Sequence, residues 1–451
     1  MRIAFVPIDN RPVCYNLAKD IVAVDEGNEI ILPDRNLLGG LSSAASKKEI
    51  LRWLENLSDI DAMVISLDTV AYGGLVQSRR SQDNLDEIKS DLSVLKQILK
   101  SQKCKIYAFS SIMRISNNNY NIEEKVYWSE YGEKIFKYSY DSDFKNQLQN
   151  PEQYGIPQSI IDDYLKTRNR NFEVNKIYLN WQKEGLFDTL IFAKDDSGQY
   201  GLNVSEARQL QNLGAKVQTG ADEIPLSLLA RTLNKNIKIY PFYTSEKDKT
   251  LISKYEDIAV EQSVKNQIDL AGFTLSEDVS SADLVLVINN FEVEQGEIVM
   301  KVDTKNFDGS IPDFDKSCLY ADIRFANGAD NNFVEEILKK QYNTEKFYGY
   351  AGWNTTANTL GSLLCMAKFK YNAVKYNDNA FRKLQFIRFS DDWAYQANVR
   401  QTLESLIDIT GLMENFNVKI LDFLNLDKPI KCNYTYPWNR FFEIEVDCEF
   451  N

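Results

Sequence analysis

The residues best suited to catalysis are two adjacent carboxylates, Asp195 and Asp196, which follow the apolar segment 189–193. Two like charges at this spacing raise the pKa of one carboxyl group, so that it can keep its proton and act as a general acid. Alternatively, Asp196 or Ser197 caps the helix that we expect at Glu206–Leu213, which leaves the other residue for chemistry. We therefore predict that Asp195 and Asp196 are catalytic residues.

Four other carboxylates occupy comparable positions after apolar segments: Asp9, Asp68, Asp222 and Glu223. Asp68 or Asp222 is the expected second catalytic carboxylate, while Asp9 and Glu223 are expected to bind substrate. The structural alternative at these positions is a helix N-cap or an acid in the first turn of a helix.

Arginine, aromatic and amide side chains near other segment ends could hold a substrate. Arg11 could bind a substrate carboxylate or orient Asp9. Trp353 could stack on a sugar ring, and the amides of Asn354 and Asn358 could hydrogen-bond its hydroxyl groups. A buried structural tryptophan is the alternative. The predicted substrate-binding residues are Asp9, Arg11, Tyr72, Tyr200, Glu223, Trp353, Asn354, Asn358 and Asp392.

The sequence contains no histidine. This absence excludes Ser–His–Asp and Cys–His nucleophile systems, zinc motifs built on two histidines, and histidine-based deaminase sites. Proton transfer would therefore depend on Asp, Glu, Tyr, Lys or Cys. We predict no cofactor and assign no metal ligand, and a protein without enzymatic activity stays open as an alternative.

These residues must be positioned by an α/β fold, because short apolar segments alternate with amphipathic helical patterns such as Lys47–Leu57 and Leu85–Gln102. Segments that are apolar on both faces indicate parallel strands covered by helices. Eight such segments end in polar motifs, after Ile8, Leu32, Leu67, Ile112, Ala193, Thr219, Ile323 and Ala351. Eight strands favour a (β/α)8 barrel with its site at the carboxyl ends of the strands. An open doubly wound parallel sheet is the alternative.

We expect three parts along the chain. Residues 1–236 form the first part of a parallel α/β catalytic body, with a helical insertion at about 120–185. Residues 237–315 form a small embedded α/β unit and a loop. Residues 316–451 complete the body and add a C-terminal segment. Strands within the last two parts are expected at Lys238–Tyr243, Leu284–Asn289 and Leu384–Phe389.

The 451-residue chain has a net charge of −13, from 52 basic and 65 acidic residues. A surface this acidic repels nucleic acids and anionic membranes, so we expect a small molecule or a carbohydrate as the partner.

No apolar run approaches the roughly 20 residues that span a bilayer, and no secretion signal precedes the first expected strand. We therefore expect a cytoplasmic protein, and its six cysteines, which lack paired spacing, should be free thiols. The oligomeric state stays open.

Several motifs are distinctive as a set: Val6–Pro12, Asp68 with Tyr72–Leu75, Asp195–Ser197 with Tyr200–Gly201, Gly220–Glu223, Ala326–Asp330, Gly352–Thr355 and Asp392–Trp393. This set resembles a bacterial family, domain-of-unknown-function family 4127 (DUF4127), over essentially the whole chain. The resemblance implies one continuous unit rather than a fusion, and it implies no activity. The Asp195–Asp196 pair alone is also similar to the aspartate pair of O-GlcNAcase-type hexosaminidases, which closes a barrel strand and assists attack by the substrate's acetamido group.

The sequence thus predicts a carboxylate-dependent hydrolase, and a glycosidase acting on a small sugar or glycoside is the leading hypothesis. Glycoside hydrolysis needs one protonated and one ionised carboxyl group and no histidine. Two alternatives stay open. In a metal-dependent hydrolase or lyase, Asp9, Asp68, Asp195 and Asp222 would bind a hard cation such as Mg²⁺. In a non-catalytic carbohydrate-binding protein, the acids would only hydrogen-bond hydroxyl groups.

Overall fold

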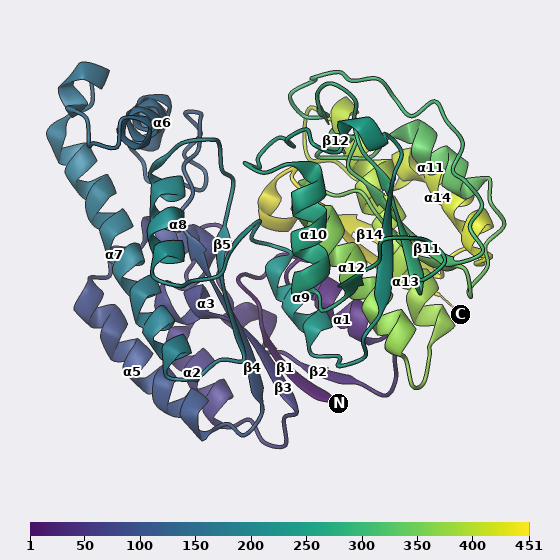
Figure 1. Ribbon diagram of the computed structural model, residues 1–451, viewed down its shortest axis with the longest axis horizontal. Helices are drawn as coiled ribbons and strands as arrows, with labels where there is room; N and C mark the ends of the chain where they lie inside the picture. Colours follow the sequence, from purple (N-terminus) through teal and green to yellow (C-terminus); the bar gives the residue numbers. More distant parts are fainter. Residues whose placement is uncertain (451) are drawn as a thin grey trace. The chain divides into compact units, whose positions relative to one another are not determined.

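The computed structural model describes residues 1–450, and the chain divides into two compact units. Unit 1 comprises Met1–Tyr15, Ile30–Pro225 and Tyr255–Asp257, and unit 2 comprises Asn16–Glu29, Leu226–Lys254 and the chain from Ile258 onward. Each unit is built around a parallel sheet with helices packed on it (Figure 1).

The sheet of unit 1 has six strands in the order β2-β1-β3-β4-β5-β6. They are β1 (Arg2–Val6), β2 (Glu29–Ile31), β3 (Ala62–Ser66), β4 (Lys105–Ile112), β5 (Thr189–Lys194) and β6 (Val217–Thr219). The pairings from β1 through β6 are parallel. Almost every residue of β1, β3, β4 and β5 is buried. Burial of both faces accounts for their continuous apolar sequences, as expected for a parallel sheet covered by helices.

The helices of unit 1 are α2 (Lys47–Glu55), α3 (Leu67–Ala71), α4 (Leu75–Arg80), α5 (Leu85–Ser101), α6 (Trp128–Phe144), α7 (Gln158–Lys183) and α8 (Leu202–Asn212). Helix α5 begins at a capping box, in which Asn84 and Glu87 each accept a hydrogen bond from the other's backbone N–H. Figure 1 shows α5 and α7 side by side, and both contribute buried residues to the core of this sheet. The predicted helical insertion at 120–185 corresponds to α6 and α7.

The sheet of unit 2 has five parallel strands in the order β13-β11-β9-β7-β8. They are β7 (Lys238–Tyr243), β8 (Thr274–Leu275), β9 (Leu284–Asn289), β11 (Ser317–Asp322) and β13 (Phe347–Ala351). Two short pairs accompany them: parallel β10 (Gly296–Glu297) with β12 (Phe325–Ala326), and antiparallel β14 (Lys431–Thr435) with β15 (Glu445–Glu449). Its helices are α1 (Asn16–Val22), α10 (Val260–Leu270), α11 (Asn331–Leu338), α12 (Thr356–Asn372), α13 (Asp378–Arg388), α14 (Thr410–Leu424) and most of α9 (Ile224–Arg231).

A single (β/α)8 barrel is not confirmed, because the strands form two open sheets. All eight segments that the sequence singles out are strands, but six lie in the first sheet and two, β11 and β13, lie in the second. The second sheet is completed by β7, β8 and β9, which come from the segment 237–315 that we expected to be an embedded unit. The alternative expectation, an open doubly wound parallel sheet, fits this arrangement.

The strand expected at Leu384–Phe389 is wrong. These residues belong to the end of α13 and the start of a π-helix at Phe389–Val399. The buried side chains of α13 include Phe381, Leu384 and Arg388, which recur every three to four residues. That spacing is the period of a helix, whereas a strand with one covered face would bury every second residue.

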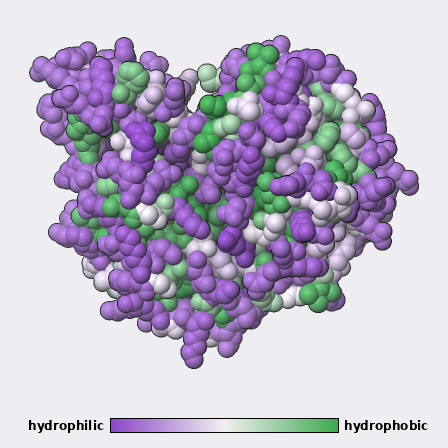
Figure 2. All heavy atoms as spheres, in the orientation of Figure 1, coloured by the Kyte–Doolittle hydropathy of each residue, from purple (hydrophilic) through white to green (hydrophobic). Residues whose placement is uncertain are grey.

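Hydrophilic side chains cover most of the face shown in Figure 2, and hydrophobic side chains lie among them singly or in small groups. Within residues 1–450, no helix combines the length and the apolar character needed to cross a membrane. The six cysteines are free thiols, as expected from their spacing.

Candidate active site in unit 1

The predicted carboxylates of unit 1 lie just beyond the carboxyl ends of its strands. Asp9 follows β1 and Asp68 follows β3, while Asp195 and Asp196 follow β5 and Asp222 follows β6. Because these strands are parallel, their carboxyl ends share one edge of the sheet. Open α/β sheets bind their ligands outside this edge. The carboxyl edge of the unit 1 sheet is therefore the candidate active site.

Arg11 joins the segments that follow β1 and β6. Its guanidinium donates to both carboxylate oxygens of Asp222, at 2.6 and 3.2 Å, and to both oxygens of Asp9, at 2.7 to 3.1 Å. All three residues are buried. The planar fork of a guanidinium suits such two-pronged contacts, and it fixes both carboxylates in position. Of the two roles considered for Arg11, the structure shows the orientation of Asp9, and it adds Asp222.

Cys14 lies beside the same ion-paired group. One ligand atom from each of Asp9, Cys14 and Asp222 lies within 4.8 Å of the others, a spacing that could hold a metal ion. The Nη2 atom of Arg11 is 3.7 Å from the Cys14 sulfur and within hydrogen-bond distance of both carboxylates. The guanidinium thus supplies positive charge where a cation would bind, and a metal ion would have to displace it.

A second charged cluster surrounds Asp195 and Asp196. Arg114, two residues beyond β4, places Nη1 3.0 Å from Asp196 and 4.0 Å from Asp195, and Nη2 2.7 Å from Glu123. Arg79 of α4 lies 3.6 Å from Asp195 and 3.0 Å from Glu123. The two arginines therefore form ion pairs with both the aspartate pair and Glu123. All of these charged side chains lie on segments that follow β3, β4 or β5.

The two carboxyl groups of the pair have different surroundings. Asp195 is 15% exposed and Asp196 is 41% exposed. Burial, followed by the charge of Asp196, raises the pKa of Asp195 to about 7 against the opposing charges of Arg114 and Arg79. Burial also raises the pKa of Asp196, but Arg114 lies closer to Asp196 and favours its ionised form more strongly. Burial and the neighbouring charge of Asp196 therefore favour the protonated form of Asp195.

Asp68 has partners inside unit 1 and is fully buried. Its carboxylate accepts hydrogen bonds from the Ser110 hydroxyl at 2.9 Å, from the Ser111 backbone N–H at 2.8 Å and from the Ser111 hydroxyl. Burial raises the pKa of Asp68 to about 6, and these hydrogen bonds oppose the shift. The contacts connect the end of β3 to β4.

Nearby Tyr72 is buried, with the Arg170 guanidinium 5.2 Å from its ring centre.

Gly220 and Glu223 form a close contact at the end of β6. Gly220 has a φ of +104°, and a Cβ atom at this position would lie 1.8 Å from Oε1 of Glu223. Glu223 is buried, so its side chain has little room to move away. The Gly220 N–H donates to the Lys194 carbonyl at 3.0 Å, and the Lys194 ammonium pairs with Asp257. Glycine at position 220 therefore allows Glu223 to pack at this edge.

Tyr200 follows the Asp195–Asp196 loop, and its ring packs edge-on against Tyr140 and Phe144 of α6, at centroid distances of 5.4 and 5.2 Å. These contacts give Tyr200 a structural role in attaching the loop to α6.

Three predicted substrate-binding residues lie at the end of β13 in unit 2. Trp353 is buried, and its ring packs edge-on against Phe442 at 5.6 Å. Asn354 has a left-handed φ of +59°, a conformation that asparagine tolerates better than most residues. Asn358 lies in the first turn of α12 and donates its backbone N–H and its side-chain amide to the hydroxyl of Thr355. The burial of Trp353 agrees with the structural alternative for this tryptophan.

Asp392 also belongs to unit 2 and lies within the π-helix. Its carboxylate accepts a hydrogen bond from the Gly352 N–H at 2.8 Å and lies 3.3 Å from Arg388. Burial raises the pKa of Asp392 to about 7, with Arg388 opposing the shift. These contacts connect the π-helix to the segment that follows β13.

The set of site residues predicted from the sequence lacked four members of the second charged cluster: Arg79, Arg114, Glu123 and Glu124. Arg114 could have been found, because it follows the end of β4 as the aspartates follow the other strands. Glu123 and Glu124 precede α6 in a long loop, and no local pattern distinguishes them from solvated charges.

Comparison with known protein families gives a match to the family described as "Protein of unknown function (DUF4127)", over residues 3–421. Comparisons with curated proteins and with solved structures give no match. The matched region includes every predicted site residue and runs from β1 into α14. The chain therefore belongs to the DUF4127 family, as its motifs indicated.

Proposed function

We propose that the carboxyl edge of the unit 1 sheet is the active site of a carboxylate-dependent hydrolase, with a small glycoside as the leading substrate class. The observation that carries the proposal is the unequal pair beyond β5. Asp195 has a pKa raised to about 7, while Asp196 lies 3.0 Å from the Arg114 guanidinium. Glycoside hydrolysis requires one protonated and one ionised carboxyl group that flank the bond to be broken, and in this proposal Asp195 and Asp196 supply them.

In this proposal Asp195 donates its proton to the oxygen of the leaving group as the glycosidic bond breaks. Asp196, whose ionised form is favoured by Arg114, stabilises the positive charge that develops on the sugar, or orients the group that attacks it. It takes the role that the sequence assigned to Asp68 or Asp222. A water molecule then completes hydrolysis and returns a proton to Asp195. Arg11 acts as a positioning residue, because its guanidinium is bonded to Asp9 and Asp222.

The metal-dependent alternative is supported by one observation, the grouping of Asp9, Cys14 and Asp222 within 4.8 Å. Two carboxylates and a thiol would suit a borderline cation such as Zn²⁺ better than Mg²⁺, which prefers oxygen ligands. We favour acid–base catalysis because Arg11 already neutralises both carboxylates. Loss of activity in EDTA, with recovery on addition of a divalent metal, would support the metal-dependent enzyme instead.

The test is a panel of glycosides with good and poor leaving groups, such as 4-nitrophenyl and methyl glycosides of the same sugar. For a turned-over sugar, Asp195→Asn should lower kcat/KM by about 100-fold or more for the methyl glycoside. The loss should be much smaller for the 4-nitrophenyl glycoside, whose leaving group needs little protonation. Asp196→Asn should lower both rates to a similar extent, since its charge acts on the sugar.

The matched control is Asp86→Asn, which removes a carboxylate that is 93% exposed on α5. This variant should keep the activity of the unmodified protein. Full activity of both Asp195→Asn and Asp196→Asn would refute the site. Binding of sugars, detected as thermal stabilisation, without turnover of any glycoside would instead favour a non-catalytic carbohydrate-binding protein.

A further inference from the structure

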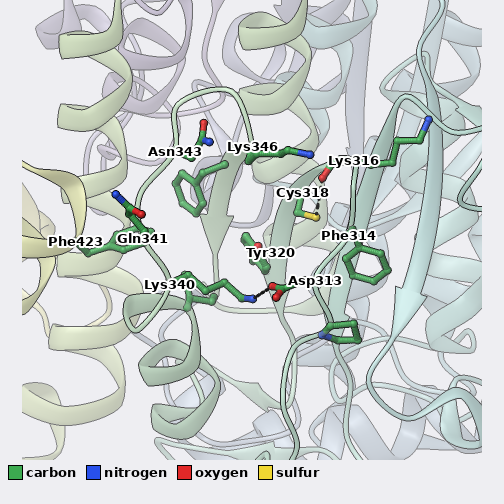
Figure 3. Close-up of a pocket in the computed structure, with 13 residues that line it drawn as sticks. Asp313, Phe314, Lys316, Cys318, Tyr320, Lys340, Gln341, Asn343, Lys346 and Phe423 are labelled. Carbon is green, nitrogen blue, oxygen red and sulfur yellow. Dashed lines mark hydrogen bonds and ion pairs between the residues drawn. The ribbon is translucent and has the colours of Figure 1, made fainter.

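A cavity of about 490 Å³ lies in unit 2, at the amino ends of β11 and β13 (Figure 3). Its walls come from the loop before β11, from β11 itself, from the segment between α11 and β13, and from α14. The residues that line it include Asp313, Lys316, Cys318, Tyr320, Lys340, Lys346, Phe347 and Phe423. A cavity of this size can enclose a small organic molecule. Its position at the amino ends of the strands separates it from the polar residues that follow β11 and β13.

Lysine ammonium groups flank this cavity. Figure 3 shows Lys340 and Lys346 on opposite sides of Cys318 and Tyr320, which share one face of β11 because they are two residues apart. The charges of both lysines lower the pKa of the Cys318 thiol. Burial has the larger effect and raises this pKa to about 11, so the thiol is neutral. The Cys318 thiol therefore adds no negative charge between the two ammonium groups.

Neither ammonium group has a buried carboxylate as its partner. Lys340 lies 2.8 Å from Asp313, whose side chain is 98% exposed, and such exposed ion pairs contribute little. Lys346 donates to the backbone carbonyl of Asp315, and no carboxylate in the described part of the chain lies within salt-bridge distance of it. Each ammonium has three N–H donors, so both can donate to an anion in the cavity.

Aromatic rings form the other wall. The Tyr320 ring stacks on Phe347 at 5.9 Å with an interplanar angle of 22°, and Phe347 meets Phe423 edge-on at 5.3 Å. Each of these rings is less than 10% exposed, and the part that faces the cavity offers an apolar surface against which a planar group can pack. The cavity thus combines an apolar wall with a rim of three lysines, Lys316, Lys340 and Lys346, and one carboxylate, Asp313, although the chain as a whole carries a charge of −13.

We propose that this cavity binds a small organic anion, whose carboxylate or phosphate contacts Lys340 and Lys346 and whose ring packs against Tyr320 and Phe347. This inference is independent of the hydrolase proposed for unit 1. Benzoate and phenyl phosphate are the probes, with benzyl alcohol as the neutral analogue and acetate as the anion without a ring. Binding is measured by calorimetric titration of the full chain at constant ionic strength.

We expect one of the two aromatic anions to bind at least about tenfold more tightly than benzyl alcohol and acetate. Only the aromatic anions can both accept hydrogen bonds from the ammonium groups as an anion and pack a ring against the aromatic wall. Which of the two binds more tightly distinguishes a carboxylate ligand from a phosphate ligand. Equal binding of the aromatic anions and benzyl alcohol, or no binding of any probe, would overturn the proposal without any variant.

Three substitutions sharpen the test. Lys346→Met and Lys340→Met should each weaken binding of the preferred anion by about tenfold, while Asp313→Asn should tighten it about twofold or more by removing the competing carboxylate. Lys339→Met is the matched control, because Lys339 is 69% exposed, pairs with Glu336 and does not line the cavity. Unchanged binding in both Lys340→Met and Lys346→Met would contradict the proposal.

Discussion

At the scale of single residues, the central feature is the protonation of Asp195. Its pKa of about 7 in the folded protein exceeds the value of about 4 expected for an unfolded chain. Between these pH values the folded protein holds a proton that the unfolded chain has released. The free energy of unfolding therefore falls as pH rises through this window, and the contribution of Asp195 is fully favourable only below about pH 4.

Asp195→Asn should remove this pH dependence, because an amide does not titrate. The difference in the free energy of unfolding, variant minus unmodified protein, should therefore increase by about 1–3 kcal/mol from about pH 4 to about pH 8. Urea unfolding at several pH values measures the difference. Asp86→Asn should show the same pH dependence as the unmodified protein, and a parallel curve for Asp195→Asn would show that Asp195 titrates normally.

At the residue scale the sequence identified the aspartates but not the side chains that set their properties. Asp195 and Asp196 were predicted from their position after an apolar segment. The different surroundings of the two depend on Arg79 and Arg114, which approach from α4 and from the end of β4. A pKa depends on burial and on neighbouring charges in space, and no local sequence pattern contains that information.

At the scale of elements, the turn after β6 depends on glycine. Gly220→Ala should lower the free energy of unfolding by about 1–3 kcal/mol, because a residue with a Cβ is strained at a φ of +104° and the new atom would overlap Glu223. Thermal or urea unfolding measures the loss. Gly198→Ala is the control in the loop after β5, where a Cβ would meet no atom within 4 Å. Equal stability of the two variants would contradict the argument.

The elements themselves were largely predictable. Strands β7 and β9 have the predicted bounds, Lys238–Tyr243 and Leu284–Asn289, because each is a continuous apolar run with clear ends. The end of α13 was mistaken for a strand, because Leu384–Phe389 is a short apolar segment when it is considered apart from Phe381 and Asn377. Its helical period appears only over the whole helix, from the Asn377 cap onward.

At the scale of the whole molecule, the sequence predicted the eight strands of the expected barrel, and β7 and β9 in addition, but not how they divide between sheets. Alternating strands and helices are common to barrels and open sheets. The difference lies in which strands pair, and β11 pairs with β9 and β13 through contacts between residues far apart in the chain. Local apolar patterns do not specify such partners. The family, by contrast, was recognisable from motifs along the whole chain.

The net charge of −13 also belongs to this scale. If the proposed hydrolase acts on glycosides, the negative field should slow the approach of an anionic substrate and leave a neutral one unaffected. We expect kcat/KM for a glucuronide to rise as salt increases from about 0.02 to about 0.3 M, because salt screens the repulsion. The corresponding glucoside should show little change. A glucuronide rate that falls with salt would indicate a locally positive site instead.

The most direct test of the central claim is a ¹³C NMR titration of the Asp195 carboxyl group in protein labelled at aspartate, with Asp195→Asn used to assign its resonance. We predict a midpoint near pH 7, because burial and the charge of Asp196 favour the protonated form. A midpoint near pH 4, the ordinary value for aspartate, would contradict the account, because Asp195 would then be ionised at neutral pH and could not act as the general acid.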